Sequence, residues 1–270
     1  MGPDQKSAKI LGGGSFNPSA SSSSALQQAC RGLLSFWEST RRTLRRDGLL
    51  VFLWEILVRC TAPLGSVALL SLYDRDLKES LPEIKPLAEI AVTVASESDI
   101  ELIATQIAVD FEGGLDALPA VLSKVRFRLQ LGQVCFIAKI GAELVHYTWI
   151  AFRSSPVQDR IIILKDHEAY LAWAYTLEAW RGKHIYPAVD SHVLLFLQKG
   201  GFRRVLTLVK TENRSSRTGL ERVGWRQIGN LLTLKPRWRP HTWIWCLSGK
   251  GLAERFPNEC PPLPEMHFDA

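Results

Sequence analysis

One segment of the chain, residues 176–200, has the pattern of a strand end, a basic turn and a helix, and it constrains the fold more than any other. The residues before the turn, 169–177, are apolar and aromatic, which predicts a buried strand. Pro187 suits the first position of a helix, because its fixed φ fits there and its missing N–H would have no partner. Apolar residues then recur at helical spacing until Gly200-Gly201, which predicts the helix end. We therefore expect a strand–turn–helix unit of an α/β protein.

The turn itself, residues 179–186, is suited to an anion. The first N–H groups of a helix have no partner inside the helix, and the helix dipole places partial positive charge beside them. Arg181 and Lys183 add two full charges at the same place. Such a turn favours a phosphate or pyrophosphate. The alternative is an ordinary basic surface turn, which many α/β units have.

The residues after this helix continue an ordered series. A second apolar strand, 202–209, is followed by Asn213-Arg214-Ser215-Ser216, a short helix and Gly224-Trp225. With Arg181-Gly182-Lys183, the series resembles the core of the GNAT superfamily of acyl-CoA N-acyltransferases over about residues 88 to 236. The resemblance implies an α/β fold, with a GNAT-like mixed, mostly antiparallel sheet flanked by helices and, here, an N-terminal helical extension. It also implies direct transfer of an acyl group, acetyl being the first choice, from acyl-CoA to an amine acceptor.

The resemblance assigns coenzyme A binding to the strand end, the turn and the Asn-x-x-Ser motif. The corresponding residues are Leu177, Ala179, Arg181, Gly182, Lys183, His184, Ile185, Tyr186, Asn213 and Ser216. His184 and Tyr186 replace two family glycines, and we expect their rings to point outward from a turn of unchanged shape; alternatively, Tyr186 contacts the ligand or acts as a substitute acid. Asn213 is alternatively only an N-cap. The general-acid Tyr of the family corresponds to Leu220, so that role does not carry over.

A glutamate near the start of the strand 169–177 often serves as general base in this family. It removes a proton from the acceptor ammonium, usually through water. Glu168 is the nearest match and Glu178 the second; for both, the alternative is a solvated or salt-bridged carboxylate. The backbone N–H groups of this strand would polarise the thioester carbonyl. Three ring-bearing residues on an earlier strand either face the acceptor or pack in the sheet: His146, Tyr147 and Trp149.

Four parts are expected along the chain. They are a disordered tail (1–28), a helical N-terminal extension (29–85), a GNAT-like acyltransferase domain (86–247) and a C-terminal arm (248–270). In the extension, residues 66–73 predict an additional edge strand. In the domain, Ser98 is the expected cap of a helix. Further expectations are a hairpin of 133–140 and 144–152, a loop at 154–159 and a sheet-extending strand at 160–164.

The net charge of +6 and the pI of about 9.1 favour an anionic ligand or surface. Coenzyme A is such a ligand, whereas no nucleic acid is expected, since no recognised binding motif accompanies the charge. The five cysteines are odd in number, widely spaced and without a Cys-x-x-Cys pair, which fits a reducing compartment. We expect a cytoplasmic protein. No metal is expected, because no His or Cys residues stand at metal-ligand spacing.

Residues 33–58 combine Leu, Phe and Trp with two arginine pairs, and Glu55 interrupts an apolar run too short to span a bilayer. They form either a packed helix or an interfacial amphipathic helix that makes peripheral membrane contact. Two alternatives to an N-acyltransferase therefore stay open. One is a non-catalytic GNAT-fold module that binds acyl-CoA, and the other is a membrane-associated interaction protein.

Overall fold

The computed structural model describes residues 49–239, 241–249, 251 and 253–256. The expected tail 1–28, the start of the extension and the end of the arm therefore lie outside the described residues. The chain divides after Leu57 into two units, and the first contributes only the beginning of helix α2 (Leu49–Thr61). Within the described ranges, no helix has the length and apolar character needed to cross a membrane.

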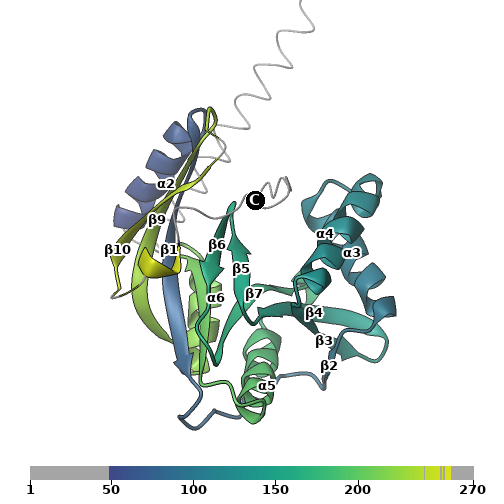
Figure 1. Cartoon of the computed structure of the whole chain (residues 1–270). Helices are drawn as coiled ribbons and strands as arrows, with labels where there is room; N and C mark the ends of the chain where they lie inside the picture. The colour runs from purple at the N-terminus through teal and green to yellow at the C-terminus, as the bar shows by residue number, and fades with distance from the viewer. Residues whose placement is uncertain (1–48, 240, 250, 252, 257–270) are drawn as a thin grey trace, which may run out of the picture. The chain divides into compact units, whose positions relative to one another are not determined.

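The second unit is built on an eight-stranded sheet with the order β10-β9-β1-β8-β7-β4-β3-β2 (Figure 1). Neighbouring strands are antiparallel, except that β7 and β8 are parallel. This confirms the expected mixed, mostly antiparallel sheet. The strands are β1 (Gly65–Asp76), β2 (Ala91–Val94), β3 (Val134–Ile140), β4 (Glu143–Ala151), β7 (Glu168–Thr176), β8 (Arg204–Lys210), β9 (Arg226–Pro236) and β10 (Trp243–Ser248).

Three predictions about the strands are wrong. The strand predicted at the sheet edge is β1, which lies inside the sheet between β9 and β8, so the sheet begins within the segment assigned to the helical extension. The predicted loop 154–159 contains strand β5 (Ser154–Val157). Among the described strands it pairs with β6 (Arg160–Ile163) alone, in a separate two-stranded sheet, so the predicted strand 160–164 forms but does not extend the main sheet. Pro156 favoured a loop, yet proline is tolerated in a strand with one open edge.

Helices cover both faces of the sheet. α3 (Glu97–Phe111) and α4 (Leu118–Gln130), joined by the short η1 (Leu115–Ala117), pack against one face of β3, β4 and β7. α5 (Ile185–Lys199) and α6 (Arg214–Arg222) pack against the other. The cap of α3 is Ser96 rather than the predicted Ser98: the Ser96 N–H donates to Asp99 Oδ2 at 2.8 Å, which is half of a capping box.

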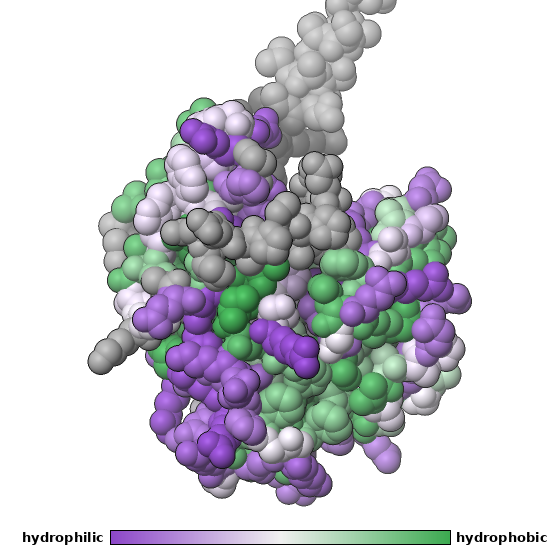
Figure 2. All heavy atoms as spheres, in the orientation of Figure 1, coloured by the Kyte–Doolittle hydropathy of each residue, from purple (hydrophilic) through white to green (hydrophobic). Residues whose placement is uncertain are grey.

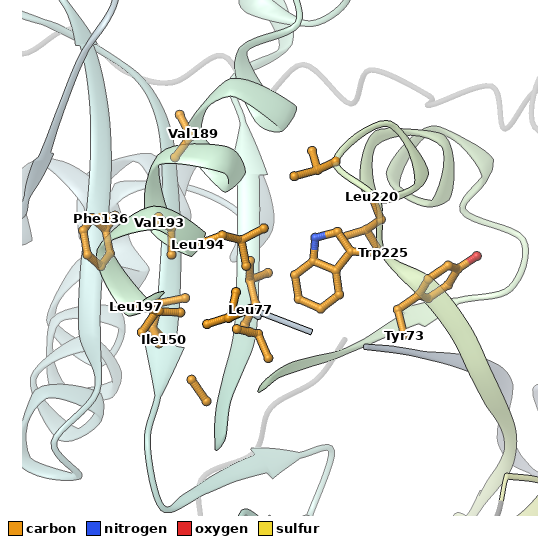
Figure 3. Packing of buried hydrophobic residues seen from close by; sticks show 14 of the residues in the cluster. Tyr73, Leu77, Phe136, Ile150, Val189, Val193, Leu194, Leu197, Leu220 and Trp225 are labelled. Carbon is orange, nitrogen blue, oxygen red and sulfur yellow. The ribbon is translucent and has the colours of Figure 1, made fainter. Parts of the chain in front are cut away.

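The core around α5 fixes where this helix begins. Val189, Val193 and Leu197 are fully buried and pack between the strands and the α6 region (Figure 3). Figure 3 shows Phe136 and Ile150 on one side of the helix, and Leu220 and Trp225 on the other. Since burial of each such side chain stabilises a fold by about 1.5–3 kcal/mol, α5 is held firmly in place. Its first turn is therefore fixed beside the end of β7, to which the short η2 (Glu178–Trp180) connects it.

Candidate functional site

The two parallel strands pair over only a short stretch. The pairs run from Glu168 with Arg204 to Tyr170 with Leu206, and no later pair between β7 and β8 is found in the described part of the chain. Just beyond, the Thr207 hydroxyl donates to the Leu171 carbonyl at 2.8 Å. β7 then continues to Thr176 paired with β4 alone. Backbone groups along the other edge of β7, at residues 172–176, therefore lack a strand partner and can bond an extended ligand.

The turn between β7 and α5 has an unusual backbone. Gly182 has φ 77° and His184 has φ 59°, both in the left-handed region. A Cβ on Gly182 would meet no atom within 4 Å, so the space beside it is open. His184 is the N-cap, and its side chain makes no capping hydrogen bond to the first-turn N–H groups. Pro187 is thus the third helical residue rather than the predicted first, and the N–H groups of Ile185 and Tyr186 are placed at the mouth of the turn.

The two basic side chains of the turn are held on aromatic rings. The Arg181 guanidinium lies 5.3 Å from the Tyr175 ring centroid, and its Nε donates to the Thr176 carbonyl at 3.2 Å. Lys183 Nζ lies 4.0 Å from the centroid of Trp180. These contacts keep both charges at the carboxyl end of β7. The turn therefore combines left-handed backbone, first-turn N–H groups and two cations, which suits an anionic ligand.

The ring of Tyr186 does not point outward, which corrects the sequence prediction. It stacks on His146 of β4, with centroids 5.9 Å apart and an interplanar angle of 27°. The same ring also covers Gly219 of α6, where a Cβ would lie 2.7 Å from Tyr186 Cδ1. Burial, and secondarily the nearby Asp190, raise the pKa of Tyr186 well above its usual value, so its hydroxyl stays protonated. His184, in contrast, is exposed, as predicted.

Gly219→Ala should therefore change the free energy of unfolding in opposite directions in two backgrounds. In the wild type the added Cβ collides with the Tyr186 ring, which costs about 1–3 kcal/mol and outweighs the higher helix propensity of Ala. In a Tyr186→Ala background the collision is absent, so Gly219→Ala should stabilise by about 0.5–1 kcal/mol. Urea unfolding of the four proteins measures both effects. An effect of the same sign in both backgrounds would show that the ring does not cover Gly219.

His146 is buried at the same end of the sheet. It is 1% exposed, and its Nδ1 lies 2.7 Å from the Thr176 hydroxyl. Its Nε2 is buried and has no hydrogen-bond partner among the described residues. Burial lowers the pKa of His146 to about 3, so the imidazole is neutral at physiological pH. It can therefore offer a ligand an uncharged donor or acceptor nitrogen, depending on its tautomer.

The other two ring-bearing residues of β4 lie on the face of the sheet opposite to His146. Tyr147 and Trp149 are fully buried in the cluster formed with α3 and α4. Trp173 and Tyr175 of β7 share that face and are partly exposed, and each makes an edge-to-face contact with the ring of Phe111. Of the three β4 residues weighed as facing an acceptor, only His146 is next to the turn; Tyr147 and Trp149 pack in the sheet.

Glu168 does not lie at this site. Arg255 holds its carboxylate in a two-point ion pair, at 2.6 Å and 2.9 Å, and the Lys165 N–H donates to it at 3.0 Å. Burial alone would raise the pKa of Glu168, but these hydrogen bonds prevail and lower it. Since a strand rises about 3.3 Å per residue, Glu168 lies roughly 26 Å from Thr176 at the other end of β7. Glu168 is therefore a salt-bridged carboxylate, which was the alternative to a general base. Glu178 is exposed at the start of η2.

The remaining residues predicted to bind coenzyme A include several that have structural roles. Asn213 is the N-cap of α6: its Oδ1 accepts from the Ser216 N–H at 3.1 Å and from the Ser215 hydroxyl at 2.9 Å. This fits the capping alternative. The Leu177 N–H donates to the Val145 carbonyl at 3.0 Å, so Leu177 continues the pairing of β7 with β4, and Ala179 is exposed in η2. Leu220 is fully buried, in keeping with its loss of the acid role.

Sequence reasoning missed Asp190, a buried acid on α5. It is 1% exposed and accepts from Trp225 Nε1 at 2.6 Å, one helical turn after Tyr186. Burial raises the pKa of Asp190 to about 7, although the bonds with Trp225 and the charge of Arg75 oppose the rise. The sequence could have indicated this buried acid, because Asp190 lies between Val189 and Val193 on the apolar face of a predicted helix.

The surface around α6 and α5 differs in hydropathy. Figure 2 shows hydrophilic side chains at the lower left of that view, around α6, and apolar ones over α5. The exposed apolar residues of α5 include Leu195 and Phe196.

Within the described ranges, no group of three or more His, Cys, Asp or Glu side chains is placed to hold a metal ion.

No family model matches the chain, and a search of curated proteins finds no match either. Among solved structures, a GNAT-family acetyltransferase from Colwellia psychrerythraea is similar at 11% identity and a TM-score of 0.47, over 65% of this chain and 59% of that one. A GCN5-related N-acetyltransferase from Sphaerobacter thermophilus is similar at 14% identity and a TM-score of 0.48, over 67% of this chain and 56% of that one. The chain thus spans less than two thirds of either structure.

A third similar structure is AAC(6')-Iy in complex with the bisubstrate analog CoA-S-monomethyl-acetylneamine. It matches at 16% identity and a TM-score of 0.43, over 52% of this chain and 92% of that one. Another structure of AAC(6')-Iy, which is described as an aminoglycoside N-acetyltransferase in complex with coenzyme A, is similar at 15% identity.

Proposed function

We propose that this chain binds an acyl-CoA and transfers its acyl group to an amine. One observation carries the proposal: β7 and β8 part after Tyr170, and the open edge of β7 leads to a helix N-terminus that carries Arg181 and Lys183. An extended thioester arm fits along the open edge, because backbone groups there lack a strand partner. A pyrophosphate fits the turn, where N–H groups, the helix dipole and two cations coincide.

The chemistry follows from what these groups can do. The amine nitrogen attacks the thioester carbonyl carbon, the C–S bond breaks, and coenzyme A leaves as a thiol after gaining a proton. N–H groups of β7 stabilise the negative charge that develops on the carbonyl oxygen. His146, neutral and next to Thr176, orients the attacking amine through a ring nitrogen, while its lowered pKa makes it a poor proton acceptor. Glu178 stays the candidate base among the carboxylates, since Glu168 is occupied by Arg255.

A non-catalytic acyl-CoA-binding module is the second candidate. It is favoured by the Tyr186 ring, which takes up space between β4 and α6, and by Leu220, which cannot donate a proton. The two candidates share coenzyme A binding and differ only in turnover, so a turnover assay separates them.

The test is the release of thiol from acetyl-CoA across a panel of amines, with His146→Gln as the variant and the exposed His192→Gln as the matched control. We expect thiol release that depends on both substrates. Because the amine would lose the group that orients it, His146→Gln should lower turnover by about two orders of magnitude while leaving acetyl-CoA affinity unchanged, and His192→Gln should change neither. Binding without thiol release from any amine would favour the non-catalytic module. Failure to bind acetyl-CoA would refute both candidates.

A further inference from the structure

The outer edge of the sheet exposes large apolar side chains on β10 and on the turn that leads to it. The exposed fractions are 67% for Trp238, 44% for Trp243 and for Trp245, and 57% for Leu247. We call these four residues the tryptophan edge. Single exposed apolar residues are ordinary on protein surfaces, but three tryptophans within eight residues of chain are not.

The strand register explains why these side chains face outward. Ile244 and Cys246 pack against the buried cluster that contains Leu231, so the alternate residues Trp243 and Trp245 face the other way. They lie opposite Leu234 and Leu232 of β9, which are half-buried and form an apolar base beside them. The tryptophan edge is therefore a feature of the folded sheet.

The same part of the chain carries only positive charge. Between Arg226 and Gly249 there are four basic residues, Arg226, Lys235, Arg237 and Arg239, and no Asp or Glu. Arg237 and Arg239 are exposed and flank Trp238 directly. Neither makes an ion pair with another described residue. A basic rim around an apolar edge is complementary to a surface that is anionic outside and apolar beneath.

We propose that the tryptophan edge binds the surface of an anionic membrane. Tryptophan rings lie at the boundary between headgroups and acyl chains, where one side of the ring is apolar and the indole N–H is hydrated. Arg237 and Arg239 would contact phosphate groups at headgroup level, while Leu247 and the rings enter the acyl boundary. The site is separate from the turn at Arg181, so it adds peripheral attachment to the proposed acyl transfer rather than depending on it.

Ring geometry argues against single-stranded nucleic acid as the occupant. Trp243 and Trp245 contact each other edge to face, with an interplanar angle of 75° and centroids 5.9 Å apart. Successive bases stack on ring faces, and two rings at this angle do not form a common platform. A second copy of the chain is the other occupant that the test must detect.

The experiment is co-sedimentation of the full chain with phosphatidylcholine vesicles, with and without phosphatidylglycerol. The wild type should bind the anionic vesicles only, and binding should weaken as salt rises. Trp243→Ser with Trp245→Ser, and separately Arg237→Gln with Arg239→Gln, should each lower the partition coefficient by roughly 10- to 30-fold. The second pair changes only exposed charges, so it stays informative if the first pair disturbs folding.

Matched controls remove similar groups elsewhere. Lys199→Gln with Arg222→Gln removes two exposed charges, and Leu195→Ser with Phe196→Ser removes two exposed apolar side chains of α5. Both control pairs should bind like the wild type. If the wild type does not bind anionic vesicles, or if both edge variants bind them as well as the wild type does, the proposal is wrong. A wild-type dimer that the tryptophan variant makes monomeric, without vesicle binding, would identify the edge as a contact between copies and overturn it equally.

Discussion

Glu168→Gln should lower the free energy of unfolding by about 3–5 kcal/mol, because it leaves the buried guanidinium of Arg255 without a countercharge. Arg255 is 8% exposed, so water cannot replace the lost partner. The acyl-CoA affinity of the protein that remains folded should be unchanged, since Glu168 lies at the far end of β7 from the turn. Urea unfolding measures the loss. The exposed Glu178→Gln is the control and should stay within about 0.5 kcal/mol of the wild type.

The same ion pair predicts how stability depends on pH. The folded-state pKa of Glu168 is lowered, so the unfolded chain binds a proton at a higher pH than the folded protein does. The contribution of Glu168 is therefore fully present above the unfolded pKa and is lost as pH falls through the folded value. Glu168→Gln should remove that part of the acid dependence. A variant as stable as the wild type, with the same acid dependence, would mean that the pair with Arg255 contributes nothing.

Arg181→Ala combined with Lys183→Ala should weaken acetyl-CoA binding by about 30- to 1000-fold. Each charge-assisted contact to a phosphate is worth about 1–2 kcal/mol, and 1.4 kcal/mol is a factor of ten in Kd. The fold should survive, because both side chains lie at the surface of the turn on the rings of Tyr175 and Trp180. Isothermal titration calorimetry gives the affinities directly.

The control for this pair separates a specific contact from general electrostatic attraction. Arg237→Ala with Arg239→Ala removes the same net charge from exposed positions after β9, two strands beyond β8 in the sheet, and it should change the affinity less than about threefold at physiological ionic strength. Equal losses in the two pairs would mean that only the overall positive charge attracts the ligand. No loss in either pair would remove the turn from the site.

The local elements were predictable because their signals are local. The helical spacing of Val189 and Val193, and the Gly141-Ala142 turn between β3 and β4, each depend on residues close together in the chain. The place of β1 was not predictable in this way. It pairs with β9 through register positions such as Leu69 with Leu232, which are more than 150 residues apart in the chain. The sequence of an apolar strand does not indicate which strands it will pair with.

The site shows the same division. The turn and its two cations could be recognised from Arg181, Gly182 and Lys183, since glycine and basic residues before a helix have a local meaning. The inward position of Tyr186 could not, because the space for its ring is made by Gly219 on another helix. Likewise, the sequence could not show that Glu168 is in an ion pair, because its partner Arg255 is distant in the chain.

The most direct test of the central claim is amide hydrogen exchange with and without saturating acetyl-CoA. If the ligand lies along the open edge of β7 with its phosphates at the turn, exchange should slow at residues 172–176 and at Ile185 and Tyr186. Strand β10, at the far edge of the sheet, should exchange as before. The variant Arg181→Ala with Lys183→Ala should lose the protection at the same ligand concentration. Acetyl-CoA that binds without slowing exchange at 172–176 and the start of α5 would contradict the account.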